Sequence, residues 1–486
     1  MVGEQQEHPW LRRIPSIEAL LLEGTQDAEL GSLPRPLLTD ILRETAAELR
    51  AALAAGGEGN SPGADADGEA VRHQLTLDLL ARARHKAGAL VRPFYRRAIN
   101  ATGIILHTGL GRAPLPAAAL RQIAGELRGY SVLQQSVETG ERSRRDAGVE
   151  RLLQRLTGAE AATVVNNNAA ATMIALQALA SGKEVIVSRG QLIEIGGSFR
   201  LPDVMAASGA RLVEVGTTNK THLRDYERAI TPATGAIMRV HPSNYRIHGF
   251  AKSVATEELV ALARPRGIPV IDDLGAGALI DLSRFGFEKE PTIQESLRAG
   301  ADLVLSSADK LIGGPQGGII LGRADLIGLI RKSPLARIVR VDKLTLAALE
   351  ATLRSFLDTE TAWRDVPTLR LLRRPLEEIA AAAESLGREL LGDHPIAAEV
   401  TIEEGVSFMG GGSLPEQQLP TRLVAIRPVP VAATEFAARL RRGTPAVFAR
   451  IHDDRVLLDP RTLLEGEAEE VAAAIRAALP PVAPSP

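Results

Sequence analysis

The chain has 486 residues, 24% of them charged, and a formal net charge of −2, a composition typical of a globular protein with several domains. It contains no cysteine, which excludes disulfides, thiolate metal sites and a cysteine nucleophile, and we expect no metal site. No apolar run approaches the ~20 residues of a membrane span, and the opening MVGEQQEHPW lacks a signal-peptide pattern. We therefore expect a cytoplasmic protein without a membrane segment.

Residues 1–97 are predicted to form a separate helical N-terminal domain. Apolar residues recur at helical spacing in three stretches: IPSIEALLLEG, LLTDILRETAAELRAALAA and AVRHQLTLDLLARARHKAGALV. Residues 1–90 are acidic overall, with nine Lys/Arg against 14 Asp/Glu. The run 81–97 differs, because it holds six Lys/Arg, no acid and two aromatics. By itself this run fits a solvated helix end that leads into a linker.

From residue 98 to 345, short β-rich runs alternate with helices, which predicts an α/β domain with a mainly parallel sheet and crossover helices. The predicted buried strands are 161–165, 184–188, 211–216, 235–240, 268–273, 302–307 and 317–321. Residues 346–486 are predicted to form a smaller C-terminal α/β domain. In an open α/β sheet, ligands bind beyond the carboxyl ends of the strands, so polar residues that follow the strands should converge.

Four groups of polar residues follow predicted strands: Asn166–Asn168, Asn244, Asp272 with Asp273, and Ser306–Lys310. Three asparagines at a helix start can bind a phosphate, although one of them can simply cap the helix. The two aspartates can cap a helix or turn, or bind a ligand. Lys310, between a strand and a glycine-rich loop, is either a surface lysine or a lysine that forms a Schiff base with a carbonyl.

One cofactor uses all of these groups together. Pyridoxal phosphate needs a lysine, an acid at its ring nitrogen, a donor to its ring hydroxyl and a set of phosphate donors. The order of these groups along the chain indicates a fold type I pyridoxal-phosphate enzyme. The predicted cofactor-binding residues are Lys310, Asp273, Asp272, Asn244, Asn167, Asn168 and Ser307. The sequence leaves open which aspartate faces the ring, because neighbouring residues of a strand point to opposite faces.

Long phrases carry a more specific signal than this pattern. They are INATGIILHTGLGRAPL (99–115), LTGAEAATVVNNNAAA (156–171), IEIGGSFRLPDVMAASGARLVEVGTTNKTHLRDYERAI (193–230), VHPSNYRIHGF (240–250), IDDLGAGAL (271–279) and SADKLIGGPQGGIILGR (307–323). Through these phrases, nearly the whole chain resembles the bacterial selenocysteine synthase family, the L-seryl-tRNA(Sec) selenium transferases, which are fold type I pyridoxal-phosphate enzymes.

The resemblance implies conversion of L-seryl-tRNA(Sec) to L-selenocysteinyl-tRNA(Sec). In this reaction the serine hydroxyl is eliminated and selenium from selenophosphate is added. Lys310 would hold the cofactor and move the Cα proton, and Asp273 would keep the pyridinium nitrogen protonated. Arg112, Arg337 and Arg340 would bind the anionic substrate, because the planar guanidinium suits phosphate-like anions. Without the resemblance, Arg337 and Arg340 fit a solvated helix face equally well.

The resemblance also implies a homodecamer in which the N-terminal domain grips the tRNA, and we expect some of the tRNA contacts to come from the run 81–97. Two alternatives remain at this stage. A pyridoxal-phosphate paralogue would catalyse elimination from a small amino acid, although such relatives typically lack the N-terminal domain. A catalytically inactive scaffold or nucleic-acid-binding protein would have no need of Lys310, Asp273 or the asparagine run.

Overall fold

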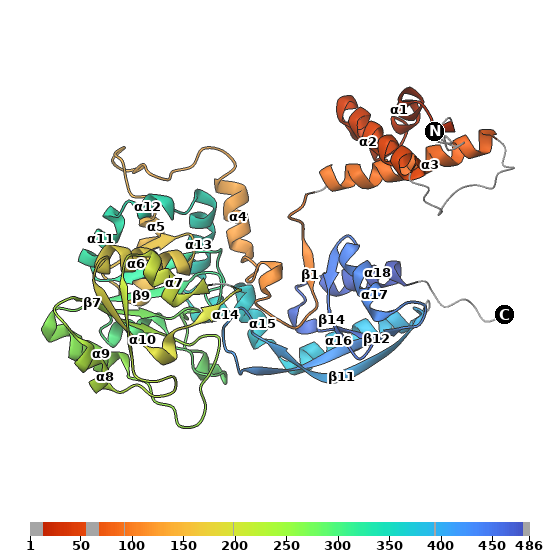
Figure 1. Ribbon diagram of the computed structural model, residues 1–486. Helices are drawn as coiled ribbons and strands as arrows, with labels where there is room; N and C mark the ends of the chain where they lie inside the picture. The colour runs from red at the N-terminus through yellow and green to blue at the C-terminus, as the bar shows by residue number, and fades with distance from the viewer. Residues whose placement is uncertain (1–12, 55–67, 92, 198, 393–394, 480–486) are drawn as a thin grey trace, which may run out of the picture. The chain divides into compact units, whose positions relative to one another are not determined.

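The computed structural model describes residues 13–54, 68–91, 93–197, 199–392 and 395–479. The chain divides into two compact units, Met1–Arg97 and Ala98–Pro486, which we call the N-terminal unit and the C-terminal unit and describe separately (Figure 1). Within the described ranges, every helix is too short or too polar to cross a membrane.

The N-terminal unit consists of α1 (Ile17–Gly24), α2 (Arg35–Ala54) and α3 (Gly68–Val91), which occupy the three predicted helical stretches. Ser16 caps α1 by accepting a hydrogen bond from the N–H of Ala19 at 3.2 Å. The core is formed by leucine, isoleucine and alanine side chains, with Leu20, Leu42 and Leu79 fully buried. The aliphatic faces of three helices are therefore sufficient to build this core.

The basic residues on α3 are less available than the sequence suggested. Three of the six cations of the run 81–97 form ion pairs within the N-terminal unit. These pairs are Arg82–Asp78 at 2.8 Å, Arg84–Asp27 at 2.6 Å, and Lys86 with Glu48 at 2.7 Å and Glu44 at 3.2 Å. Arg82 is thus paired within α3, Arg84 with the turn after α1, and Lys86 with α2. The expectation that the run 81–97 contacts tRNA stays a prediction.

The C-terminal unit contains a seven-stranded sheet in the order β2-β10-β9-β8-β7-β3-β6. Its strands are β2 (Ala161–Val165), β3 (Glu184–Ser188), β6 (Arg211–Val215), β7 (Thr234–Val240), β8 (Val270–Asp273), β9 (Leu303–Ser307) and β10 (Gly318–Gly322). All neighbouring strands are parallel except β10, which is antiparallel to both β2 and β9. The prediction of a mainly parallel sheet is confirmed.

Helices cover both faces of this sheet, which explains why its strands, except the edge strand β6, are almost continuously buried. One face packs against α6 (Asn168–Ala180), α7 (Leu201–Ala207) and α11 (Ala324–Lys332). On the other face lie α5 (Ala147–Thr157), α8 (Leu223–Ala229), α9 (Thr256–Ala263), α10 (Ile293–Arg298) and α13 (Lys343–Ser355). The carboxyl ends of the central strands are left for a ligand.

A four-stranded antiparallel sheet lies in the C-terminal part of the chain, in the order β11-β12-β15-β14. Its strands are β11 (Ala398–Phe408), β12 (Gln418–Pro428), β14 (Arg450–His452) and β15 (Arg455–Leu458), and its core is shared with α16 (Leu376–Leu391), α17 (Ala433–Arg442) and α18 (Glu467–Ala478). Here β1 (Ala98–Asn100), which the sequence assigned to the large domain, pairs in parallel with β13 (Ala446–Phe448).

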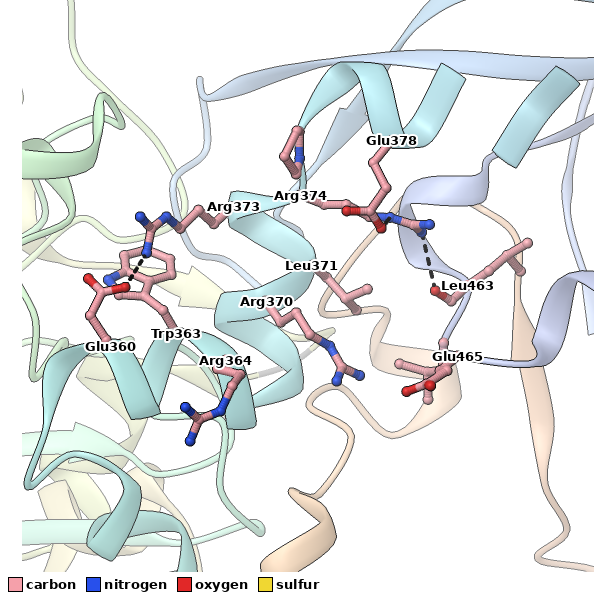
Figure 2. Close-up of a pocket in the computed structure, with 12 residues that line it drawn as sticks. Glu360, Trp363, Arg364, Arg370, Leu371, Arg373, Arg374, Glu378, Leu463 and Glu465 are labelled. Atoms are coloured by element: carbon pink, nitrogen blue, oxygen red, sulfur yellow. Dashed lines mark hydrogen bonds and ion pairs between the residues drawn. The ribbon is translucent and has the colours of Figure 1, made fainter. Parts of the chain in front are cut away.

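Two helices that the sequence analysis did not predict, α14 (Thr359–Asp365) and α15 (Pro367–Arg373), precede this C-terminal sheet. They line a cavity of about 500 Å³ together with the segment 463–465 (Figure 2). Its arginines are mostly engaged by neighbouring groups. Arg373 binds Glu360 at 3.1 Å, and Arg374 donates to the carbonyl of Leu463 at 3.5 Å. Arg374, directly after α15, thus contacts the segment that borders the cavity on its other side.

Candidate active site

A cavity of about 340 Å³ lies at the carboxyl ends of β2, β8 and β9. Its polar lining includes five of the predicted cofactor-binding residues from three separate stretches of chain: Asn167, Asn168, Asp273, Ser307 and Lys310. Parallel strands end at the same edge of a sheet, so residues far apart in sequence meet there. The expected convergence of these groups is therefore observed.

Lys310 is a buried lysine, with 7% of its surface exposed, and it lies three residues beyond the end of β9. Burial lowers the pKa of its ammonium group, and the adjacent Asp309 carboxylate only partly opposes this effect. A buried amine with a lowered pKa is the form of lysine that attacks a carbonyl. The interpretation of Lys310 as an ordinary surface lysine is thereby excluded.

The glycines around Lys310 allow close backbone packing. Gly313 has a φ of +70°, and a Cβ there would lie 2.4 Å from a methyl group of Val366. A Cβ at Gly318 would lie 2.1 Å from the carbonyl oxygen of Asn167. These contacts leave no room for a side chain, so the loop after Lys310 packs directly against Val366 and the start of β10 packs against the start of α6.

Asp273 is the aspartate that faces the cavity, with 4% of its surface exposed. Its carboxylate accepts hydrogen bonds from Asn168 Nδ2 at 2.9 Å, Thr172 Oγ1 at 2.8 Å and the N–H of Gly275 at 3.0 Å. Burial raises the pKa of Asp273, and these three donors work against that shift. The donors fix the orientation of the carboxylate.

Asp272 lies on the opposite face of β8 and is fully buried there. Its carboxylate forms an ion pair with Arg239 at 2.8 Å and accepts a hydrogen bond from Thr256 Oγ1 at 3.2 Å. The inclusion of Asp272 among the cofactor-binding residues is therefore corrected. The alternation of side chains along a strand turns it away from the cavity that contains Asp273.

The asparagine run serves the local structure as well as the cavity. Asn167 is the N-cap of α6, and its side chain accepts the N–H of Ala170 at 2.8 Å. Asn168 donates to Asp273, while its Oδ1 atom is buried without a hydrogen-bond partner. The first N–H groups of a helix have no partner within the helix, and Asn168 and Ala169 of this first turn line the cavity. The start of α6, with Ser307 nearby in the lining, forms a candidate anion site.

The structure places Ser243, rather than the predicted Asn244, in the cavity wall. Ser243 is 1% exposed and lines the cavity. Asn244 instead donates through Nδ2 to the carbonyl of Glu194 at 3.1 Å. Within a tight turn, neighbouring side chains point in different directions, so the strand–turn pattern located the turn but not the residue that faces the ligand.

Arg112 also lines the cavity, where its Nη1 atom lies 2.7 Å from Oδ2 of Asp309. Its backbone is left-handed, with a φ of +62°, at the end of the turn that follows Thr108–Leu110. Asp309 is 6% exposed, and sequence reasoning missed it as a site residue although it precedes Lys310. Its position next to the lysine was the only available signal.

Arg337 and Arg340 are not brought to this cavity. Both are exposed, one in α12 (Leu335–Ile338) and the other just after it. Arg340 lines a separate cavity of about 240 Å³ together with Arg145. Burial lowers the pKa of Arg145, and the charges of Arg340 and Arg337 lower it further. In a single chain, these cations therefore form a cluster of their own, apart from Arg112.

A second segment missed from the sequence closes the cavity from the C-terminal part of the chain. Gly411 and Gly412 line the cavity and have φ values of +61° and +70°. A Cβ at Gly412 would lie 2.6 Å from a methyl group of Ile195, and one at Gly411 would lie 2.9 Å from Cβ of Leu106. This segment is thus a backbone wall of the cavity.

Among solved structures, the chain is similar to D-glucosaminate-6-phosphate ammonia-lyase, with a TM-score of 0.53 and 22% identity over 79% of this chain and 95% of that chain. This similarity supports the fold. Among proteins, the chain is 47% identical over 472 residues to the L-seryl-tRNA(Sec) selenium transferase of Desulfomicrobium baculatum, covering 96% of this chain and 98% of the relative. The enzyme of the same name from Moorella thermoacetica is 51% identical over 395 residues, which cover 81% of this chain and 83% of the relative.

Two family models match the chain. The model described as selenocysteine synthase N terminal matches residues 11–50, in the N-terminal unit. The model described as L-seryl-tRNA selenium transferase matches residues 98–464, which span the sheet, Lys310 and the C-terminal glycine segment. The chain therefore belongs to the L-seryl-tRNA selenium transferase family and has the fold type I architecture predicted from its sequence.

Proposed function

We propose that the protein is a pyridoxal-phosphate-dependent L-seryl-tRNA(Sec) selenium transferase. It would eliminate the hydroxyl of L-seryl-tRNA(Sec) and add selenium from selenophosphate, giving L-selenocysteinyl-tRNA(Sec). The observation that carries this proposal is the buried Lys310 in one cavity with Asp273, in a chain that matches transferases of this name over 96% of its length.

The residues of the cavity fit pyridoxal phosphate. Lys310 offers a buried amine for covalent attachment, and Asp273 offers an oriented carboxylate for the ring nitrogen. The first turn of α6 and Ser307 offer donors for the phosphate group. The buried, unpaired Oδ1 atom of Asn168 is a further polar group in this lining that a ligand would satisfy. When bound, the cofactor supplies an electron sink for the electron pair left at Cα.

The chain's own groups handle the proton. With its pKa lowered by burial, the Lys310 amine is available in its neutral form to take the proton from Cα of the seryl group. Asp273 holds a proton at the ring nitrogen, because its three donors keep the carboxylate pointed at one place. The Gly411–Gly412 wall excludes water on the side of the C-terminal part without placing side chains in the cavity.

The charges of the cavity favour an aminoacyl ester over a free amino acid. Among the described lining residues, the cationic side chains are Lys310 and Arg112. Lys310 is committed to the cofactor, and Arg112 is neutralised by Asp309 at 2.7 Å. The carboxylate of a free amino acid would therefore be buried without a cation to pair with. Burying an unpaired charge costs several kcal/mol. The carboxyl group of a seryl-tRNA is an uncharged ester.

This argument weighs against the alternative, a paralogue that catalyses elimination from a small amino acid.

We also propose that the N-terminal unit binds tRNA and that Arg337 and Arg340 bind selenophosphate. In a single chain these two arginines lie outside the cavity, so their proposed role requires that selenium reach the cavity from their cluster. A homodecameric state and a cytoplasmic location stay predictions.

The test is conversion of seryl-tRNA(Sec) by the purified protein with radiolabelled selenophosphate, followed by identification of the amino acid released from the tRNA. We expect labelled selenocysteine from the wild type and none from Lys310→Ala. Release of ammonia and pyruvate from free L-serine, without label on the tRNA, would instead identify the small-substrate paralogue.

A further inference from the structure

Two aromatic side chains at the end of the N-terminal unit are almost fully exposed. Phe94 is 88% exposed and Tyr95 is 94% exposed, just beyond the last residue of α3, Val91. Their ring centroids lie 5.2 Å apart at an interplanar angle of 86°, an edge-to-face arrangement. An edge-to-face pair leaves ring faces open to solvent, so both rings are available to a partner.

The fold of the N-terminal unit does not use these rings. Its core consists of leucine, isoleucine and alanine side chains from α1, α2 and α3. Phe94 and Tyr95 are the only aromatic residues of this unit within the described part of the chain. Leu90 and Val91 are also exposed, by 66% and 55%. Packing within the unit thus does not explain the exposed side chains of Leu90, Val91, Phe94 and Tyr95 in this segment.

The surroundings of the two rings are basic. Arg96 and Arg97 follow them directly and are exposed, and the run 81–97 contains no acidic residue. Exposed aromatic rings next to arginines are the combination that binds unpaired nucleotides, because bases stack on the rings and phosphates pair with the guanidinium groups.

We infer that Phe94 and Tyr95 form a stacking surface for unpaired nucleotides of the tRNA substrate. The inference rests on the proposed function and adds to it a contact site, formed by base stacking rather than by charge alone. It also accounts for tRNA binding by a unit with an excess of acidic residues, because stacking energy does not depend on net charge. The competing occupant of this segment is a second copy of the chain, which the experiment distinguishes.

The experiment measures the affinity of the full-length protein for seryl-tRNA(Sec) in Phe94→Ala, Tyr95→Ala and the double variant, over a range of salt concentrations. Each single change should raise Kd about tenfold, as removal of one stacked base contact does. The slope of log K against log salt should stay that of the wild type, because no phosphate contact is lost. Tyr95→Phe should bind like the wild type, because it keeps the ring.

The matched control is Leu22→Ala, which removes another exposed apolar side chain, 67% exposed, from the same unit. It should leave Kd unchanged. Sedimentation of the tRNA-free protein is measured in parallel and should be the same for every variant. Wild-type affinity in both alanine variants, a changed salt slope, or altered sedimentation would overturn the inference, and the last of these would assign the segment to contact between copies.

Failure of the inference can be told apart from failure of the proposed function. If the wild type converts seryl-tRNA(Sec) but the alanine variants bind it equally well, the stacking surface alone is wrong. If the wild type neither binds nor converts seryl-tRNA(Sec), both are wrong.

Discussion

Asp272 and Asp273 are consecutive residues with opposite surroundings. Asp273 accepts hydrogen bonds from Asn168 and Thr172 in the cavity of Lys310, whereas Asp272 pairs with Arg239 at 2.8 Å on the other face of β8. We therefore propose separable tasks for the two carboxylates: Asp273 for the chemistry, and Asp272 for the stability of the sheet.

Asparagine substitutions should separate these tasks. Asp273→Asn should keep the fold but lower turnover on the order of 100-fold or more, because a neutral amide cannot hold the proton at the ring nitrogen. Asp272→Asn should lower the free energy of unfolding by roughly 2 kcal/mol, because a buried ion pair is lost, while much of the turnover remains. Turnover and thermal unfolding of both variants check this, and the reverse ranking would mean that Asp272 is the functional carboxylate.

Lys310 should be the residue that carries the cofactor. Borohydride reduction of the pyridoxal-phosphate-loaded protein, followed by peptide mapping, should place the label on the peptide 303–323. Lys310→Ala should take up no covalent label, because the amine that forms the bond is missing. A matched control is Lys332→Ala, which removes an exposed lysine of α11 and should keep full labelling. A label on any other lysine would refute the assignment.

The buried amine of Lys310 should also appear in the pH dependence of stability. Its pKa in the folded, cofactor-free protein is lowered by burial, whereas an unfolded lysine titrates near ~10.4. Between these two values the unfolded state binds more protons, so stability rises with pH. The measured quantity is the unfolding temperature of the wild type minus that of Lys310→Met. This difference should therefore increase as pH is raised from 7 toward 10. A difference that is constant over this range would mean that the pKa is not lowered.

Asp309 should decide between free and esterified serine. Asp309→Asn removes the carboxylate that pairs with Arg112, so Arg112 can bind the carboxylate of free L-serine. The affinity for free L-serine should rise about tenfold, which is the gain expected from one charged hydrogen bond. Binding of L-serine methyl ester should not improve. Changes in the absorbance of the bound cofactor report both affinities. Glu350→Gln, which breaks the ion pair with Arg354 at 2.6 Å outside the cavity lining, is the control and should change neither affinity.

Arg337 and Arg340 should matter for selenium rather than for the serine. If they bind only the anion, Arg337→Ala or Arg340→Ala should raise KM for selenophosphate about tenfold. Loss of the serine hydroxyl, measured without selenophosphate, should stay near the wild-type rate. Equal loss of both half-reactions would show that these arginines also act on the seryl group.

The sequence by itself determined the elements of this protein and most of the composition of its site. The strands 161–165 and 184–188 lie where it predicted them, because periodicity and turn residues are local signals. Lys310, Asn168 and Ser307 line the cavity as predicted, because the carboxyl ends of parallel strands meet at one edge.

Only the tertiary structure decided how these residues are used. It selected Asp273 over Asp272 and Ser243 over Asn244, because the direction of a side chain depends on how the strand and turn sit in the sheet. It paired Arg112 with Asp309, 197 residues away, and placed Gly411 and Gly412 across the cavity from β8 and β9. Such contacts join segments distant in sequence, and no local pattern encodes them, because they arise only when the sheet and the C-terminal part pack together.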